Sequence, residues 1–324
     1  MTEKTVAAAI VTYNRLELLK ESLAAVLAQT KYLSHVIVVN NLSTDGTKEY
    51  LDNLDDERVV VYHASENLGG AGGFNQAVRL FGEKLQDDFI WLMDDDTIPE
   101  AAALEHLVDF MLTHPQSGFV NSQVRWGSVT GNPSWMNVTA PRPFTWQRYL
   151  TDTKNPAVEV VNSTFVSVMF SREMVAMVGL PQKEYFIWGD DMEYTNRIAN
   201  IQRGYMVMNS LAIHKSKENT KPGDIVAEVD DTRLWRYNFE YRNRILTARR
   251  ISKKEMIKTL MVAIVRDFRK TLLKSGVAYR GKKLGVIIRG LWRGLFFNPA
   301  IEYAEGLRKP KTKSLHDKEM ELLD

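Results

Sequence analysis

The chain has 324 residues, of which 44% are hydrophobic and 25% charged, and these proportions exclude wholesale disorder and a collagen-like fibre. The absence of cysteine excludes disulfides, thiolate nucleophiles and cysteine-ligated zinc or iron–sulfur sites. The net charge of +2 conceals a division, because residues 1–230 carry 19 basic and 30 acidic side chains whereas residues 231–324 carry 23 and 10. This asymmetry is typical of a chain whose basic part meets a polyanion or an anionic membrane.

The first hundred residues alternate between strand-like and helix-like patterns. Apolar runs predict strands at residues 6–11, 35–39, 59–62 and 89–93, and a helical repeat of leucine and valine runs from residue 16 to residue 27. This alternation predicts βαβ units and a mostly parallel α/β sheet. Ligands of such sheets bind beyond the carboxyl ends of the strands. Polar segments lie at three of those ends, at residues 12–15, 40–47 and 94–97.

Three consecutive carboxylates, Asp94, Asp95 and Asp96, directly follow the fourth expected strand. Adjacent like charges repel one another, and a hard divalent cation with oxygen ligands is the simplest compensation. The position at a strand's carboxyl end favours a metal site, and a solvated turn is the alternative.

A second acidic cluster follows an aromatic run and comprises residues 188–194. A carboxylate beside apolar rings is partly desolvated, which raises its pKa and suits a general base. The alternative is that the cluster caps the helix expected after it. His214 closes the strand expected at residues 205–213 and is a candidate third metal ligand, although a lone histidine is more often structural.

A glycine-rich segment, residues 67–75, follows the third expected strand, and we expect a helix from Gln76 to Phe81 after it. Glycines let the backbone approach a phosphate, and a helix N-terminus attracts an anion. The segment lacks the lysine of a nucleotide-binding P-loop, and it does not follow the first strand as a dinucleotide fingerprint would. It therefore indicates some phosphate-bearing ligand.

Taken together, these motifs resemble the inverting, GT-A-fold glycosyltransferases of family 2. The likeness covers about residues 5–215 and rests on five motifs in order, at residues 10–15, 40–47, 67–73, 94–96 and 188–194. Within the family the chain is most similar to galactofuranosyltransferases, and rhamnosyltransferases share most of the pattern. Gly189 separates Trp188 from the two aspartates, which departs from the usual Trp–Asp–Asp order and leaves open which aspartate is the base.

The resemblance implies a role for each motif. It implies that Mn²⁺ or Mg²⁺ binds to Asp94, Asp96 and His214. Asp191, or Asp190 in its place, would deprotonate the acceptor, and Trp188 and Glu193 would position the acceptor sugar. The nucleotide-sugar donor would meet a larger set of residues, namely Thr12, Asn14, Arg15, Asp45, Asn67, Gly69, Gly70, Gly73 and Asp95.

The basic region, residues 231–324, keeps helical spacing and follows the expected GT-A catalytic domain, residues 1–230. Its segment 284–297 is strongly apolar, and Lys282, Arg289 and Arg293 fall on one helical face. That stretch is too short to span a bilayer and predicts an interfacial amphipathic helix. The alternative is a helical bundle that packs on the catalytic domain. No nucleic-acid motif accompanies the charge, so we expect no nucleic-acid partner.

We therefore expect a metal-dependent enzyme that transfers a sugar from a nucleotide donor to a glycan or lipid-linked acceptor of bacterial surface polysaccharide. The N-terminus has no signal-peptide pattern. A lipid-linked acceptor would place the enzyme in the cytoplasm, at the inner face of the plasma membrane. The donors that the resemblance favours are UDP-galactofuranose and, as the alternative, dTDP-rhamnose. A non-catalytic protein that binds nucleotide sugars is the rival class, and the sequence is compatible with an oligomer.

Overall fold

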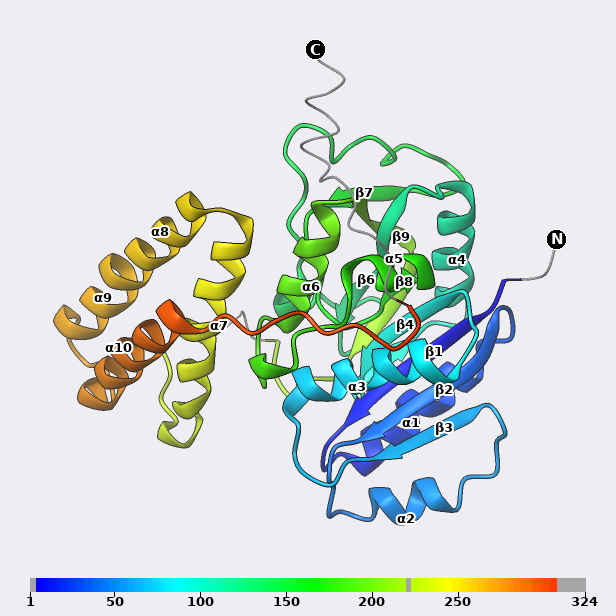
Figure 1. Cartoon of the computed structure of the whole chain (residues 1–324), viewed down its shortest axis with the longest axis horizontal. Helices are drawn as coiled ribbons and strands as arrows, with labels where there is room; N and C mark the ends of the chain where they lie inside the picture. The colour runs from blue at the N-terminus through cyan, green and yellow to red at the C-terminus, as the bar shows by residue number, and fades with distance from the viewer. Residues whose placement is uncertain (1–3, 220–222, 308–324) are drawn as a thin grey trace.

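In the computed structural model, which describes residues 4–219 and 223–307, nine strands form one mixed sheet (Figure 1). Its parallel half has the order β3-β2-β1-β4 and contains the four strands that the apolar runs predict. The bounds are β1 Val6–Thr12, β2 Leu33–Asn40, β3 Val59–His63 and β4 Phe89–Asp94. The prediction of a mostly parallel α/β sheet is confirmed.

The second half of the sheet mixes strand directions. β8 (Val168–Ser171) is antiparallel to β4 and to β6 (Ser117–Trp126), and β6 is parallel to β9 (Arg203–His214). β5 (Thr97–Pro99) and β7 (Ala157–Val160) pair antiparallel with β9. β9 is thus a long strand rather than the short one expected, and it returns to β5 so that His214 lies opposite Thr97.

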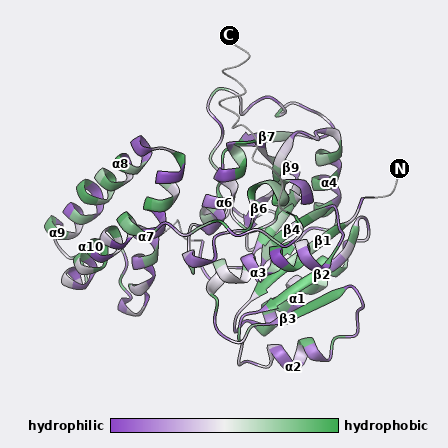
Figure 2. Cartoon of the chain, in the orientation of Figure 1, coloured by the Kyte–Doolittle hydropathy of each residue, from purple (hydrophilic) through white to green (hydrophobic). Residues whose placement is uncertain are grey.

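Helices cover both faces of the sheet, and the alternation along β1 explains how each face is filled. Ala7, Ala9 and Val11 face one core together with α3, α5 and α6, whereas Ala8 and Ile10 face a second core with α1 and α4. Figure 2 shows the central strands as the most hydrophobic part of the chain. The helix bounds are α1 Leu16–Leu27, α2 Thr47–Asp52, α3 Gly69–Lys84, α4 Ala103–Thr113, α5 Arg172–Val178 and α6 Asp190–Ala199.

The helix expected from Gln76 to Phe81 is longer than predicted, because α3 already begins at Gly69. The glycines are therefore part of the helix rather than a loop before it. A Cβ atom on Gly73 would lie 2.4 Å from Cγ1 of Val11, so this glycine lets α3 approach β1 closely. Gly69 has a φ of 68°, and a Cβ atom there would lie 2.1 Å from the Phe186 carbonyl oxygen.

The basic region forms a helical unit beside the sheet domain (Figure 1). Tyr241 and Ile245 of α7 contact Gly290 and Gly294 of α10, because the missing Cβ atoms bring the two helices together. Residues 297–307 then cross back to the sheet domain, where Ala304 packs on Gly82. Residues 308–324 of the expected basic region lie outside the described residues. The bounds are α7 Trp235–Ile251, α8 Lys253–Val262, the π-helical η4 Ala263–Phe268, α9 Arg269–Leu273 and α10 Arg280–Phe296, with short 3₁₀ turns at η1 Trp135–Asn137, η2 Lys183–Tyr185 and η3 Asp231–Arg233.

Candidate active site

The three consecutive aspartates lie where β4 ends and β5 begins, next to the loop that follows β1. Asp95 accepts hydrogen bonds from Thr12 Oγ1 at 2.9 Å and from the Tyr13 amide at 3.3 Å. Arg15 Nη1 bridges two carboxylates, at 3.1 Å from Asp95 Oδ1 and 2.8 Å from Asp96 Oδ2. The β1 and β4 ends thus bring Thr12, Arg15 and the aspartates together, as expected for neighbouring parallel strands.

The environment separates the pKa values of these carboxyl groups. Burial and the neighbouring aspartates raise the pKa of Asp94 to about 7. Burial raises the pKa of Asp95 to about 6, although the Arg15 charge opposes the shift. Burial also acts to raise the pKa of Asp96, but His214 and Arg15 outweigh it and hold that pKa below its ordinary value. At neutral pH the cluster therefore keeps its most stable negative charge on Asp96.

His214 lies beside Asp96, with Nε2 3.2 Å from Asp96 Oδ1. Its other ring nitrogen, Nδ1, lies 3.1 Å from Ser134 Oγ. Because Ser134 donates its own proton to Asn137 Oδ1 at 2.5 Å, the serine oxygen accepts from Nδ1–H. Burial acts to lower the pKa of His214, but Asp96 outweighs it and raises that pKa, so the protonated ring forms an ion pair with Asp96 through Nε2. When that proton is lost, the Nδ1–H bond to Ser134 leaves a lone pair on Nε2, the nitrogen that faces the carboxylates.

This group of residues fits a divalent cation that is shared with a substrate. Within residues 4–219 and 223–307, no three carboxylate or imidazole groups lie close enough together to hold an ion by themselves. Asp96 Oδ1 is nevertheless buried without a hydrogen-bond partner and faces His214 Nε2. Mg²⁺ is commonly held by one or two carboxylates and completed by substrate phosphates and water. The chain supplies a partial ligand set of that kind in Asp96 and His214, with Asp94 adjacent.

The loops after β1 and β2 meet above the sheet. The Asn14 amide donates to Ser43 Oγ at 3.0 Å, and Asn14 Oδ1 accepts from the Thr44 amide at 2.7 Å. Asp45 accepts hydrogen bonds from the Thr47 hydroxyl and from the Leu16 and Thr47 amides at the starts of two helices. Burial acts to raise the pKa of Asp45, but these bonds outweigh it and lower that pKa. The structure thus brings the expected nucleotide-binding residues of both loops to one edge, where Asn14, Arg15 and Asp45 remain exposed.

The glycine-rich motif divides into exposed and buried positions. Gly70 is exposed and meets no atom within 4 Å of a built Cβ. Asn67 Oδ1 accepts from Asn41 and from the Gly69 amide, which holds the turn before α3. The expectation that Gly73 contacts a donor is wrong, because Gly73 is buried against β1. Gly69 is buried as well, and its role is the close approach to Phe186.

The second acidic cluster begins α6, and its two aspartates differ from the first cluster in having no cationic partner in the described part of the chain. None of its side chains caps the helix, since the N-cap position is Gly189 and Asp191 Oδ1 accepts only from the adjacent Met192 amide at 2.6 Å. Burial and the adjacent Asp191 raise the pKa of Asp190 well above its ordinary value. Burial raises the pKa of Asp191 to about 6. Among the described residues, neither carboxylate forms an ion pair.

Asp191 opens into a cavity of about 850 Å³ between the sheet domain and the helical unit. Trp188 also lines this cavity, and its ring packs edge-on against Tyr237 of α7 at 5.4 Å. Residues 136–139, from the proline- and tryptophan-rich connection, form part of the opposite wall. An aspartate with a raised pKa thus lies in a cavity large enough for a sugar acceptor.

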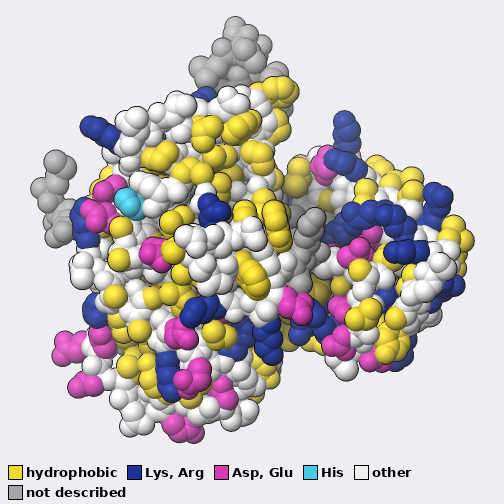
Figure 3. All heavy atoms as spheres, turned by 180° about the vertical axis from the view of Figure 1, so that it is seen from behind, with side chains coloured by type: hydrophobic (Ala, Val, Ile, Leu, Met, Phe, Trp, Pro, Cys, Tyr) yellow, Lys and Arg dark blue, Asp and Glu magenta, His cyan; other side chains and the backbone are white. Residues whose placement is uncertain are grey.

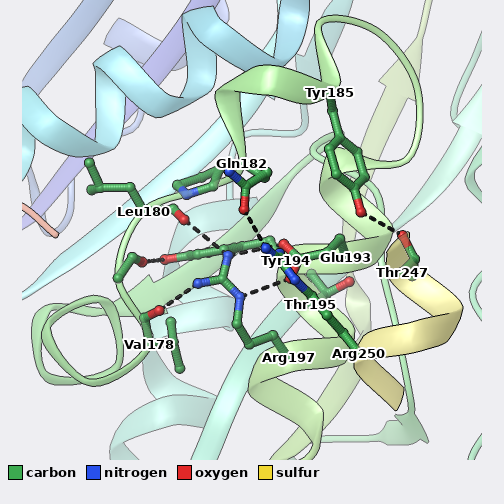
Figure 4. Close-up of polar contacts among 12 residues, drawn as sticks. Val178, Leu180, Gln182, Tyr185, Glu193, Tyr194, Thr195, Arg197, Thr247 and Arg250 are labelled. Atoms are coloured by element: carbon green, nitrogen blue, oxygen red, sulfur yellow. Dashed lines mark hydrogen bonds and ion pairs between the residues drawn. The ribbon is translucent and has the colours of Figure 1, made fainter. Parts of the chain in front are cut away.

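Glu193 does not reach this cavity, so its expected contact with an acceptor is corrected. Its carboxylate is 2% exposed and lies between two arginines, Arg197 of α6 and Arg250 of α7 (Figure 4). Arg250 Nη1 lies 2.6 Å from Glu193 Oε1, and Arg197 Nη2 lies 3.0 Å from Glu193 Oε2. Glu193 therefore joins α6 to the helical unit.

Sequence reasoning missed the residues whose side chains hold the predicted site residues in place. Ser134 and Asn137 support His214 from the connection between β6 and β7. Asn243 of α7 contacts the loop before Asp190. The tryptophan and proline content of residues 125–160 is the one available signal, since a long stretch of that composition is typical of a structured connection over a site, with an ordinary long connection as the alternative.

Comparison with known proteins agrees with this geometry. Residues 8–176 match the family model Glycosyl transferase family 2, which covers more than half of the chain. The chain therefore belongs to glycosyltransferase family 2. No helix in the described part of the chain has both the length and the apolar character needed to cross a membrane.

Two mycobacterial relatives and two solved structures are informative. Galactofuranosyltransferase GlfT1 of Mycolicibacterium smegmatis is 29% identical over 254 residues, which are 74% of this chain and 82% of the relative. GlfT1 of Mycobacterium tuberculosis is 26% identical over 256 residues, which are 75% of this chain and 82% of the relative. GalNAc-T7, solved with UDP, GalNAc and Mn²⁺, superposes with a TM-score of 0.61 at 15% identity. The superposition covers 89% of this chain and 55% of the GalNAc-T7 chain.

The mannosyltransferase PcManGT of Pyrobaculum calidifontis, solved with GDP-Man and Mn²⁺, superposes with a TM-score of 0.52 at 16% identity. The superposition covers 93% of this chain and 77% of the mannosyltransferase chain. At these identities the structural likeness concerns the fold, which is that of the GT-A glycosyltransferases.

Proposed function

We propose that the protein is a metal-dependent, inverting galactofuranosyltransferase that moves galactofuranose from UDP-galactofuranose to a glycan or lipid-linked acceptor of bacterial surface polysaccharide. The observation that carries this proposal is a division of labour between two acidic clusters. Asp94–Asp96 are compensated by Arg15 and His214, whereas Asp191 has no ion-pair partner within residues 4–219 and 223–307 and lines a cavity of about 850 Å³. The names of the mycobacterial relatives support the choice of sugar.

On the donor side, the loops after β1 and β2 hold the nucleotide, through Thr12, Asn14, Arg15 and Asp45. Asp96 and His214, with Asp94, hold the cation at the diphosphate, and that cation supplies Lewis-acid stabilisation to the leaving group. Arg15 ends in the same space as the carboxylates and adds positive charge beside the diphosphate. Gly70, exposed at the start of α3, lets the donor approach the backbone.

On the acceptor side, Asp191 is the general base and Asp190 is its alternative. The base removes the proton of an acceptor hydroxyl, the oxygen attacks the anomeric carbon, and the bond from that carbon to the diphosphate breaks. UDP leaves on the face opposite to attack, so the anomeric configuration inverts. A pKa of about 6 leaves Asp191 ionised at neutral pH yet more basic than an exposed aspartate. Trp188 offers an aromatic face to the acceptor sugar.

The outer surface of the helical unit suits an anionic membrane. Basic and apolar side chains are both exposed on α8, α9 and α10, and Figure 3 shows the two kinds interspersed on one face of the helical unit. The inner face of α10 packs on α7, as in the helical bundle that was the alternative to an interfacial helix. The outer face of α10 is left for contact with lipid. Each basic group near an anionic leaflet contributes about 1 kcal/mol. The exposed apolar side chains include Ile257, Met261, Ile264, Val265, Leu272, Leu273, Ile288, Trp292, Leu295 and Phe296.

The enzyme proposal is tested by UDP or dTDP release from a panel of nucleotide sugars with Mn²⁺, Mg²⁺ or EDTA. We expect metal-dependent turnover with UDP-galactofuranose in the presence of acceptor. Turnover only with dTDP-rhamnose would move the protein to the rhamnosyltransferases. Binding of UDP without turnover of any donor would favour the non-catalytic alternative, and NMR of the product's anomeric centre would test inversion.

The membrane proposal is tested by co-sedimentation with vesicles of phosphatidylglycerol and phosphatidylcholine. We expect salt-sensitive binding that weakens when Trp292→Ser and Phe296→Ser are combined, because both rings are mostly exposed on α10. Phe144→Ser is the matched control, since that ring is fully exposed on the connection between β6 and β7. Equal binding by all three proteins would contradict the proposal.

A further inference from the structure

We infer that Asn243 of α7 is a positioning residue for the acidic pair Asp190–Asp191, a role that rests on the proposed function. The side-chain amide of Asn243 is buried and faces the backbone of residues 185–188, the segment that leads directly into α6. Through this contact the helical unit sets where the proposed base stands.

The contact consists of hydrogen bonds to three carbonyl groups of one short segment. Asn243 Nδ2 donates to the carbonyl oxygens of Tyr185 at 3.0 Å, Ile187 at 3.1 Å and Trp188 at 2.9 Å. The Tyr185 carbonyl also accepts from Arg242 Nη2 at 3.3 Å and from the Ile187 amide at 2.7 Å. Without the Asn243 amide, the carbonyls of Ile187 and Trp188 would lose this donor, and leaving a buried acceptor without a partner is the costly way to break a hydrogen bond.

The backbone that Asn243 holds is in an unfavourable conformation. Phe186 and Trp188 have positive φ angles of 63° and 64°, a region that side-chain-bearing residues seldom adopt. Gly189 follows with a φ of 90° and is the N-cap of α6. Such conformations persist only where surrounding contacts over-determine them. The amide of Asn243 is one of those contacts, and the next residues along the chain are Asp190 and Asp191.

Arg242 fixes which way the Asn243 amide points. Its Nε and Nη2 atoms donate to Asn243 Oδ1 at 3.0 and 2.9 Å, so the oxygen is occupied and the NH₂ group must face the loop. The guanidinium itself lies over the rings of Phe297 and Phe239, and Nη2 also donates to the Glu184 carbonyl. The helical unit therefore presents a prearranged donor to residues 185–188.

The same loop also contacts the donor side of the site. The Phe186 carbonyl accepts from the Ala71 amide at 3.2 Å, in the first turn of α3. Gly69 approaches the same carbonyl so closely that no Cβ could stand there. Residues 185–188 are thus held between α3 and α7, and a change at Asn243 acts on the acceptor base while α1, β1 and the Asp94–Asp96 cluster keep their contacts.

The test compares Asn243→Asp with wild type and with Asn238→Asp. The first change keeps the shape of the side chain but replaces its two donors by a carboxylate that faces carbonyl oxygens. We expect kcat to fall about 100-fold, since a displacement of about 1 Å can cost that much. The affinity for UDP and the acceptor KM should change little. Asn238 is the control because its side chain, on the same helix, donates to the Trp235 carbonyl and to no other group in the described part of the chain.

Hydrogen–deuterium exchange supplies a readout that needs no substrate. Exchange of peptides covering residues 184–192 should rise in Asn243→Asp, while peptides of β1 and β4 stay protected. Thr247→Val is a milder second variant, because it removes only the hydroxyl that lies 2.9 Å from the Tyr185 hydroxyl, and it keeps the assay informative if Asn243→Asp does not fold. It should lower kcat a few-fold.

The outcomes separate this inference from the proposed function. Unchanged exchange at residues 184–192, or unchanged kcat, would overturn the role of Asn243. A raised acceptor KM with kcat intact would overturn it as well, because Asn243 would then be an acceptor ligand. If the wild type turns over no donor, the proposed function fails by itself, and the exchange experiment still tests whether Asn243 holds the loop.

Discussion

The two acidic clusters use the same residue type in opposite electrostatic surroundings. At Asp94–Asp96, Arg15 and His214 lie within ion-pair distance, and the pKa of Asp96 is held below its ordinary value. At Asp190–Asp191 burial meets no compensating cation among the described residues, and both pKa values are raised. Two arginines that contact α6, Arg197 and Arg250, pair with Glu193 instead.

This difference indicates how one site assigns two tasks to carboxylates. A carboxylate with a low pKa and cationic neighbours stays charged and suits work beside a diphosphate, whereas one with a raised pKa accepts a proton more readily. Glu193, two residues further along α6, also has cationic neighbours, because its carboxylate is paired with Arg197 and Arg250. The expected sensitivity of each cluster to substitution follows from this contrast.

The largest effect should come from Asp191→Asn. This change removes the proposed base while keeping the shape of the side chain, so transfer should fall about 1,000-fold. UDP affinity with Mn²⁺ should stay near that of wild type, because the first cluster is untouched. Steady-state kinetics and calorimetry measure the two quantities. Near-normal transfer would assign the base to Asp190.

Asp96→Asn should act on the first acidic cluster, Asp94–Asp96. It weakens the carboxylate that faces His214 and Arg15, and we expect Mn²⁺-dependent UDP affinity to fall by about 100-fold or more, since even outer-shell partners of a metal are worth 10–100-fold. UDP binding in EDTA should change far less. An Asp96→Asn protein that binds UDP and Mn²⁺ as wild type does would remove this residue from the metal site.

The pH dependence of kcat should show the raised pKa of the second cluster. Asp191 must be ionised to accept a proton, so kcat should fall about tenfold per pH unit below pH 6 and level off above it. The apparent value belongs to the coupled pair rather than to one residue. A profile measured at saturating donor and Mn²⁺, and flat from pH 5 to pH 8, would contradict the assignment.

A smaller effect is expected for Ser134→Ala. Without the serine oxygen, Nδ1 of His214 loses its hydrogen-bond acceptor. The neutral ring then no longer prefers the tautomer that carries its proton on Nδ1 and leaves Nε2 unprotonated. Outer-shell changes of this kind cost about 10-fold or more in metal affinity, so the Mn²⁺ concentration that gives half-maximal activity should rise by about that factor. Ser128→Ala, on an exposed turn, is the control. Equal Mn²⁺ dependence of both variants would show that Ser134 does not orient His214.

The parallel half of the sheet and the loops at its edge were predictable because their signals are local. Buried apolar runs specify β1 to β4, and the carboxyl ends of parallel strands must lie at one edge, which places Asp94–Asp96 beside Thr12 and Arg15. The start of α3 was misjudged for a local reason as well. Glycines usually interrupt helices, but here a close approach to β1 and to Phe186 outweighs their low helix propensity.

The rest depended on contacts between distant parts of the chain. Glu193 meets Arg250 after 57 residues, and Ser134 meets His214 after 80. Neither partner has a sequence pattern that points to the other, so the burial of Glu193 and the support of His214 could not be derived. The contact of Asn243 with residues 185–188 could not be derived either. Asn243 is one of several polar residues on α7, and the sequence pattern of that helix is dominated by its charged residues.

The return of residues 297–307 to the sheet domain has a consequence for how the protein is made on the ribosome. The Leu180 amide donates to the Glu302 carbonyl, Glu302 pairs with Arg79 and Lys183, and Gly82 is covered by Ala304. Domains generally fold in order of synthesis, N-terminal part first. Here α3 and the segment before Asp190 receive these neighbours only after residues 297–307 have left the exit tunnel. A nascent chain that stops at α10 therefore holds the sheet but not the finished surface beside the proposed base.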